Sequence, residues 1–74
     1  MVTVEQAKTA KGLLRERLGR PAWLRGIGIG LLPEGSFFVQ VNVEQATPDV
    51  LQAIPDKVQG VQVRVEAVGK IRGL

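Results

Sequence analysis

The chain has 74 residues, of which 45% are hydrophobic, and it carries a formal net charge of +3 with no cysteine and no histidine. This length fits one small domain with a narrow margin of stability, and the hydrophobic content excludes a disordered chain. Because cysteine and histidine are missing, disulfides, thiolate nucleophiles and cysteine-based zinc sites are excluded, and the commonest general base is absent.

The N-terminal segment MVTVEQAKTAKGLL contains charged residues and lacks the apolar run of ~7–15 residues that a signal peptide needs. No apolar stretch approaches the ~20 residues of a membrane span. We therefore expect a cytoplasmic protein without a membrane partner. A single asparagine, the missing cysteine and an arginine-rich set of cations favour a thermophilic source.

Residues 4–18 show the signals of a helix. Thr3 and Gln6 fit a capping box, in which each side chain accepts a hydrogen bond from the other residue's backbone N–H. Gly19 and Pro21 supply the C-terminal stop. Between these ends, apolar residues recur at helical spacing: Val4, Ala7, Ala10, Leu14 and Leu18.

The segment RGIGIGLLPEGSFFVQVNVE predicts two strands, 25–32 and 36–44, joined by a turn at LPEGS. Pro33 suits a type I turn, and Gly35 suits the left-handed position that follows it. Counting outward from this turn predicts an antiparallel register. Its pairs are Leu31 with Phe37, Gly30 with Phe38, Ile29 with Val39, Gly28 with Gln40, Ile27 with Val41 and Gly26 with Asn42.

Cross-strand partners share one face of a sheet, so this register separates two faces. The sheet face opposite the glycines is apolar and is predicted to form the core. On the glycine face, Phe38 stands beside Gly30 and would cover it, as aromatic side chains do for glycines in sheets. Phosphate binding by the glycines is excluded, because neither a Lys-Ser/Thr pair nor a helix follows them. The apolar face comprises Ile27, Ile29, Leu31, Phe37, Val39, Val41 and Val43.

A short helix at 48–54 and a strand at 60–68 are the last predicted elements. Thr47 caps the helix, and Pro55 ends it. The segment DKVQG between helix and strand is predicted to be a loop. The strand alternates with period two, so that Gln62, Arg64 and Glu66 point away from the core. In the tail GKIRGL, Ile71 and Leu74 are candidates for packing on the core.

The order α-β-β-α-β predicts an α+β fold: a two-layer sandwich in which both helices cover the apolar face of a three-stranded sheet. The crossover from the second strand to the third is expected to be right-handed. That rule leaves the third strand at either edge of the hairpin. We expect it beside the first strand.

The sequence offers little for catalysis. Carboxylates stand at helix starts, in turns and in loops, where acidic residues have structural uses. Ser36, the only serine, has no base to activate it. We expect a protein that is not an enzyme and that holds no metal and no cofactor.

The leading functional hypothesis is a protein-interaction module, with self-association through the uncovered sheet face or an edge strand. The glycines leave a shallow trough on that face, where another chain can approach closely, and a sheet edge can accept an added strand. Trp23 is interpreted as a lid on the core. The candidate interaction face consists of Gly26, Gly28, Gly30, Phe38, Gln40, Asn42, Gln62, Arg64 and Glu66.

The alternative is weak, sequence-independent binding of nucleic acid through the first helix. Lys8, Lys11 and Arg15 form one basic stripe, and the sequence pI of about 10.0 fits a basic surface. Against this, Glu5 and Glu16 stand at pairing distance from cations, as on any exposed helix. Three arginines are candidates to extend the stripe: Arg17, Arg20 and Arg25.

The segments GRPAWLRGIGIG, FFVQVNVE and VQGVQVRVEAVGKIRGL resemble a short bacterial domain family of unknown function. The resemblance covers about residues 13–74. Similar units occur alone and beside trypsin-like peptidase domains. The resemblance therefore implies a third possibility, an accessory or pro-segment-like partner of a peptidase, and it supplies no catalytic residue.

Overall fold

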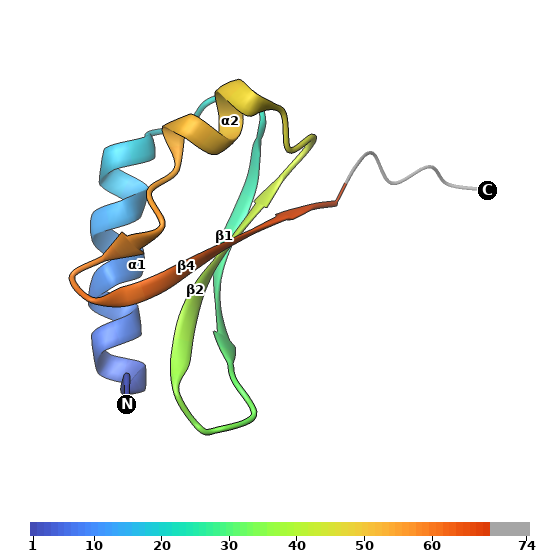
Figure 1. The fold of residues 1–74 in the computed structure, drawn as a ribbon. Coiled ribbons are helices and arrows are strands. Elements are labelled where there is room, and N and C mark those ends of the chain that lie inside the picture. The colour runs from blue at the N-terminus through green and yellow to red at the C-terminus, as the bar shows by residue number, and fades with distance from the viewer. Residues whose placement is uncertain (69–74) are drawn as a thin grey trace.

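Two helices and a four-stranded mixed sheet make up residues 1–68, the part of the chain that the computed structural model describes (Figure 1). The strand order is β1-β2-β4-β3, with β2 antiparallel to β1 and parallel to β4. The predicted α+β class is confirmed. The predicted packing of Ile71 and Leu74 lies outside the described residues. The elements are α1 (Val4–Leu18), β1 (Leu24–Leu31), β2 (Phe37–Val43), α2 (Pro48–Ala53), β3 (Lys57–Val58) and β4 (Val61–Ala67).

Helix α1 begins and ends where the sequence predicts. The Thr3 hydroxyl accepts from the Gln6 backbone N–H at 3.2 Å, and the Thr3 backbone N–H donates to Gln6 Oε1 at 2.8 Å. At the other end Gly19 has φ of +68° and donates its N–H to the Arg15 carbonyl at 2.9 Å. The capping box and the glycine stop therefore set both boundaries.

The register of the β1–β2 hairpin is confirmed at all six predicted pairs, from Gly26 with Asn42 to Leu31 with Phe37. Gly35 takes a φ of +96°, which only glycine adopts at little cost. Its N–H donates to the Leu32 carbonyl at 2.9 Å and closes the turn. Beyond Gly26 the register shifts by one residue, so that the strand continues through a bulge to its start.

The predicted place of the last strand was wrong. β4 lies beside β2, not beside β1, and runs parallel to it, with Val39 opposite Val63. The physical reason is the difference between the two hairpin strands. Val39, Val41 and Val43 of β2 are fully buried, whereas β1 carries glycines and its residues are only partly buried or exposed. A glycine-rich strand is a weak centre for a sheet, so β2 takes the central position and β1 the edge.

The prediction of three strands was also wrong, because the segment read as a loop contains β3. Lys57 and Val58 pair with β4 across the two-residue turn Gln59–Gly60. Both turn residues have positive φ, +48° and +79°, as a type I′ hairpin requires. Glutamine is not among the residues that favour such a turn, and a two-residue strand is too short to show alternation. The sequence therefore did not predict β3. The other boundaries agree with prediction to within one residue.

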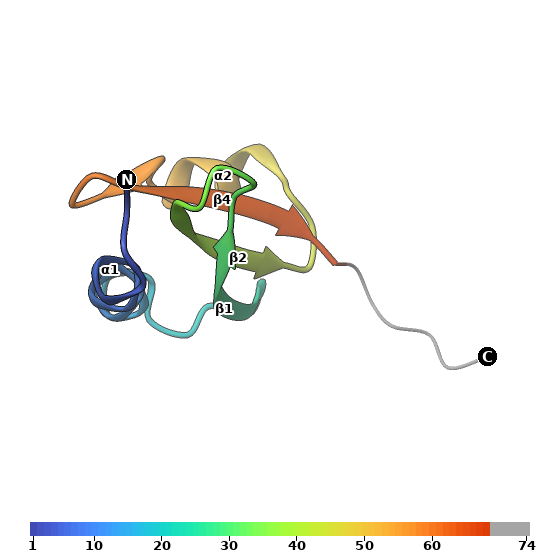
Figure 2. The same ribbon diagram turned by 90° about the horizontal axis from the view of Figure 1, so that it is seen from below.

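Both helices contribute to one core on the same side of the sheet, and no helix of residues 1–68 lies on the opposite side (Figures 1 and 2). Trp23 packs against this core as the predicted lid. α1 runs alongside β1 and β2, while α2 covers the end of the sheet where β2 ends (Figure 1). The buried core residues are Ala10, Leu14, Val39, Val41, Val43, Val50, Ile54, Val61 and Val63.

Candidate functional site

The nine residues of the candidate interaction face do lie on one side of the sheet, the side without helices. Cross-strand neighbours among these residues form rows that run from β1 through β2 to β4. The sequence had predicted the last strand on the other side, next to β1. Gln62 alternates with Arg64 along β4 and so lies on the same face. The rows are Gly26–Asn42–Glu66, Gly28–Gln40–Arg64 and Gly30–Phe38.

Most of this outer face is already occupied by its own side chains. Gln40 Nε2 donates to Asn42 Oδ1 at 3.0 Å and to Glu66 Oε2 at 2.7 Å. The Arg64 guanidinium lies 4.8 Å from the centre of the Phe38 ring. Phe38 is only 7% exposed, and its ring occupies the space where Gly30 would carry a side chain. The predicted cover of Gly30 is confirmed, and this part of the face offers no free apolar surface.

The trough predicted for three glycines is therefore open at two of them. A Cβ built on Gly26 or Gly28 would meet no atom within 4 Å. Both residues belong to β1, the edge strand of the sheet. The open surface of the outer face thus lies along the β1 edge and not at the centre of the sheet.

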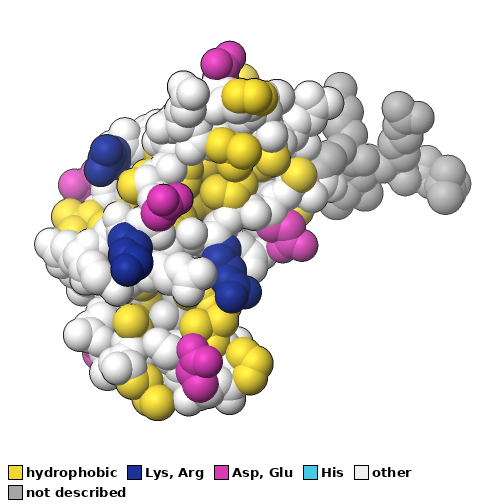
Figure 3. Space-filling model, viewed as in Figure 1, with side chains coloured by type: hydrophobic (Ala, Val, Ile, Leu, Met, Phe, Trp, Pro, Cys, Tyr) yellow, Lys and Arg dark blue, Asp and Glu magenta, His cyan; other side chains and the backbone are white. Residues whose placement is uncertain are grey.

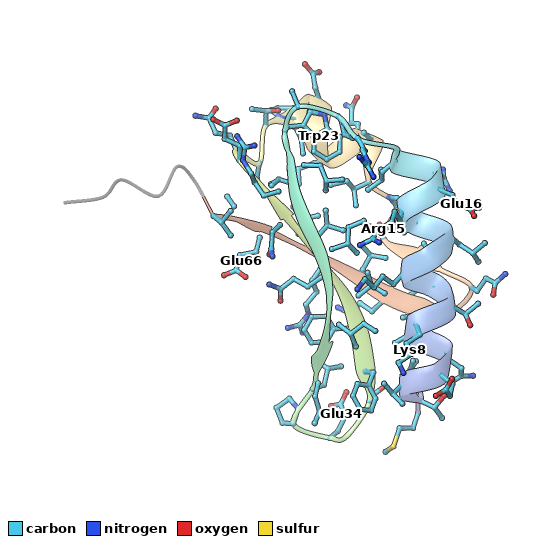
Figure 4. All side chains as sticks on the ribbon, turned by 180° about the vertical axis from the view of Figure 1, so that it is seen from behind. Lys8, Arg15, Glu16, Trp23, Glu34 and Glu66 are labelled. Carbon is cyan, nitrogen blue, oxygen red and sulfur yellow. The ribbon has the colours of Figure 1, made fainter. Side chains whose placement is uncertain are left out.

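The predicted basic stripe lies beside the same edge. Lys8, Lys11 and Arg15 line a groove of about 400 Å³ whose opposite wall is Ile29 of β1. Figure 4 shows Lys8 on α1 and Arg15 between α1 and β1. Arg15 also borders an adjoining groove of about 580 Å³ along the first half of β1. We call the two together the basic groove, lined by Lys8, Lys11, Gly12, Arg15, Gly19, Arg20, Pro21, Ala22, Leu24, Arg25, Gly26, Ile27 and Ile29.

Sequence reasoning found the stripe but missed the wall that faces it. Of the three arginines proposed to extend the stripe, Arg20 and Arg25 line the basic groove, whereas Arg17 does not. Gly26 and Ile27 line the same groove as these cations because the chain turns back after α1. No local pattern in the sequence signals that contact.

Positive charge in the basic groove is largely uncompensated. The one ion pair within residues 1–68 joins Arg25 Nη2 to Glu44 Oε2 at 2.7 Å. The expected pairing of Glu5 and Glu16 with helix cations does not occur there. On the β4 side of the molecule, by contrast, basic and acidic side chains are interspersed (Figure 3). The groove therefore combines an apolar strand with four cations that have no carboxylate partner in the described part of the chain.

The outer edge of β1, which borders the basic groove, also presents free backbone. The Leu32 N–H donates to the Ser36 carbonyl at 2.8 Å, which marks this as a hydrogen-bonded pair. Hydrogen-bonded pairs alternate along an antiparallel ladder, so Gly30, Gly28 and Gly26 bond to β2. The N–H and C=O groups of Ile27, Ile29 and Leu31 then point away from β2. No strand of residues 1–68 pairs with that edge.

Other kinds of site find less support in the described residues. Within residues 1–68, no group of three or more acidic residues lies close enough together to hold a metal ion. Neither α1 nor α2 has the length and apolarity needed to cross a membrane. Comparison with known proteins gave no match to any family model, to any curated protein or to any solved structure. The resemblance to a bacterial domain family stays a prediction.

Proposed function

We propose that this chain is a non-catalytic protein-interaction module that binds an extended segment of another protein as an additional strand beside β1. The observation that carries the proposal is the outward backbone edge of Ile27, Ile29 and Leu31, which pairs with no strand of residues 1–68 and borders an open groove at Ile27 and Ile29. In strand addition, main-chain hydrogen bonds supply affinity and neighbouring side chains supply specificity. β1 is eight residues long, enough for several such bonds.

The other edges of the described sheet are less suited to this role. At the start of β2, the Phe37 N–H already donates to the Val2 carbonyl at 3.0 Å, and the Val2 N–H donates to Ser36 Oγ at 2.9 Å. The N-terminal segment therefore occupies the side of β2 that β4 does not reach. β3, at the far edge, has two residues.

Charge disfavours a second copy of this chain as the partner. Antiparallel pairing of β1 with β1 of a second copy would relate the copies by a twofold axis perpendicular to the sheet. Both α1 helices would then lie on one face, with their basic grooves side by side. Lys8, Lys11 and Arg15 of each copy would approach like charges, which opposes association. We therefore assign the edge to a different protein.

Hydrogen exchange tests the proposal directly. Random ten-residue peptides are displayed and selected on the immobilised chain, and the best binder is added to ¹⁵N-labelled protein. We expect slower exchange at the Ile27 and Ile29 amides, with little change at Gly28, whose N–H is already bonded to β2. If no selected peptide protects the two isoleucine amides, the proposal is wrong.

A matched pair of variants separates backbone from side chain. Ile29→Pro removes an N–H that points outward from the β1 edge and breaks no bond to β2, whereas Ile29→Ala keeps that N–H. We expect the proline variant to lose peptide binding and the alanine variant to keep most of it. Circular dichroism confirms that both variants are folded. Equal binding by both would contradict strand addition.

Nucleic acid is the second candidate, because the structure gathers five cations along one groove: Lys8, Lys11, Arg15, Arg20 and Arg25. Such binding would weaken steeply with salt. It would be abolished when Lys8, Lys11 and Arg15 are replaced by glutamate, and it would survive Ile29→Pro. Anisotropy of labelled oligothymidine measures both. The accessory role beside a peptidase rests on the resemblance alone.

A further inference from the structure

We infer, building on the proposed strand addition, that the partner segment alternates acidic side chains with bulky apolar ones. The acidic side chains would face α1, and the apolar ones would lie over the open glycines of β1. The basic groove lies on the α1 side of this eight-residue edge and reaches Gly26 near its start, while the open Gly28 belongs to the outer face. One added strand would therefore meet both surfaces at once.

The alternation follows from strand geometry. Side chains of neighbouring strands that lie opposite one another share a face of the sheet. Partner residues opposite Ile27 and Ile29 would thus point to the α1 side, into the basic groove. Those opposite Gly26 and Gly28 would point to the outer face. Successive partner residues therefore meet a basic wall and a glycine surface in turn.

The α1 side calls for negative charge. Lys8, Lys11 and Arg15 extend over eight residues of helix, a rise of about 10 Å from the first to the last. Alternate residues of a strand are separated by ~7 Å, so two or three acidic side chains would match this length of helix. None of these three cations has a carboxylate partner within residues 1–68, so a partner would not have to displace one.

On the outer face of the sheet, large partner side chains would fit best. Phe38 over Gly30 shows that this face packs an aromatic ring against bare backbone, and the Arg64 guanidinium lies over that ring. Gly26 and Gly28 present the same bare backbone without a cover. An aromatic or branched side chain on the added strand would fill that space.

A protein segment fits this edge better than a nucleic acid. The edge offers alternating N–H donors and C=O acceptors, and a polyphosphate backbone supplies acceptors alone. The wall that faces the cations includes the apolar Ile27 and Ile29. Stacking surfaces for bases are scarce, because the chain has three aromatic residues and the Phe38 ring is buried.

The probe is a blocked, fluorescent peptide with glutamate at three alternate positions, phenylalanine at the two positions between them, and serines at both ends. Three controls accompany it: lysine in place of glutamate, the same composition with the glutamates adjacent, and oligothymidine. We expect the alternating acidic peptide to bind at least about tenfold more tightly than either peptide control. It should also slow exchange at the Ile27 and Ile29 amides.

Variants of the chain locate the contacts. Lys8→Glu with Arg15→Glu should weaken binding of the acidic peptide by about tenfold or more, while Arg17→Glu, on α1 but outside the groove, should not. Gly28→Val should weaken binding by filling the trough. Its Cβ meets no neighbour, so folding should be unaffected.

The outcomes separate this inference from the proposed function. If library peptides protect Ile27 and Ile29 but are not acidic, and the double charge reversal leaves their affinity unchanged, the inference is wrong and strand addition stands. If no peptide protects these amides, both are wrong. If oligothymidine binds more tightly than the acidic peptide and displaces it, the groove is a nucleic-acid site and the inference is overturned.

Discussion

The two edges of the sheet are built in opposite ways. The β3 edge consists of two residues, one of them Lys57, held by a tight turn to β4. The β1 edge runs for eight residues and includes Ile27 and Ile29 beside an open groove. Sheets usually protect their edges with short strands and charges, because an exposed edge invites pairing with other chains. β3 follows that practice, whereas β1 departs from it.

At the β1 edge, positive charge on α1 limits pairing with other chains, as a short strand would do elsewhere. Lys8, Lys11 and Arg15 repel a second basic chain from the edge but attract an acidic one. The bulge between Leu24 and Gly26 also disturbs the ladder at one end of the strand. Comparison of the two edges therefore supports selective use of β1 as a binding edge.

The largest expected effect is the difference in amide exchange within β1. The Gly28 amide bonds to β2, and the Ile27 and Ile29 amides face solvent. Global opening of a small domain costs ~5 kcal/mol, so the glycine amide should exchange several thousandfold more slowly than its neighbours. Hydrogen exchange followed by NMR measures this alternation.

At the β3 edge, the Val58–Val61 pair flanks the turn, so only the Lys57 amide of β3 faces outward. It serves as the internal reference for a free edge amide. Equal protection of Ile27, Gly28 and Ile29 would show that another segment covers the β1 edge, which would contradict the comparison.

The next largest effect concerns two glycines of β1. Gly30→Ala would drive a Cβ into the Phe38 ring and should lower the free energy of unfolding by about 1–3 kcal/mol. Gly28→Ala meets open space and should raise it by up to ~1 kcal/mol, because the unfolded chain loses freedom. Urea denaturation measures both. The same sign for both variants would show that the trough is not confined to one end of β1.

The smallest effect is expected at the β3 edge. Gln59 holds a φ of +48°, a conformation that costs most residues ~1–2 kcal/mol and asparagine less. Gln59→Asn should therefore raise the free energy of unfolding by about 0.5 kcal/mol. It should leave peptide binding at β1 unchanged. A destabilised variant would mean that the glutamine side chain stabilises the turn in another way.

Much of the fold could be predicted because it is encoded locally. The capping box of Thr3 and Gln6, the stop at Gly19 and the left-handed Gly35 each act within a few residues. The turn position alone determined the β1–β2 register and, through the alternation of side chains, the composition of both sheet faces. The nine residues of the candidate interaction face follow from that alternation.

The position of β4 in the sheet and the existence of β3 could not be predicted from local sequence signals. All strands present the same backbone donors and acceptors at their edges, so side-chain alternation tells which face a strand buries but not which neighbour it takes. Burial of β2 between two strands decided the order. The hairpin of β3 and β4 was not predicted because its turn contains Gln59, whereas such turns favour asparagine, aspartate and glycine.

The sequence by itself determined the helix boundaries, the hairpin register and the two faces of the sheet, since caps, turns and alternation depend on near neighbours along the chain. Only the tertiary structure decided that the stripe of Lys8, Lys11 and Arg15 would face the free edge of β1. That juxtaposition depends on how α1 packs across the sheet. Side chains from α1, α2, β2 and β4 set this packing jointly in one core, so no single segment of the sequence contains it.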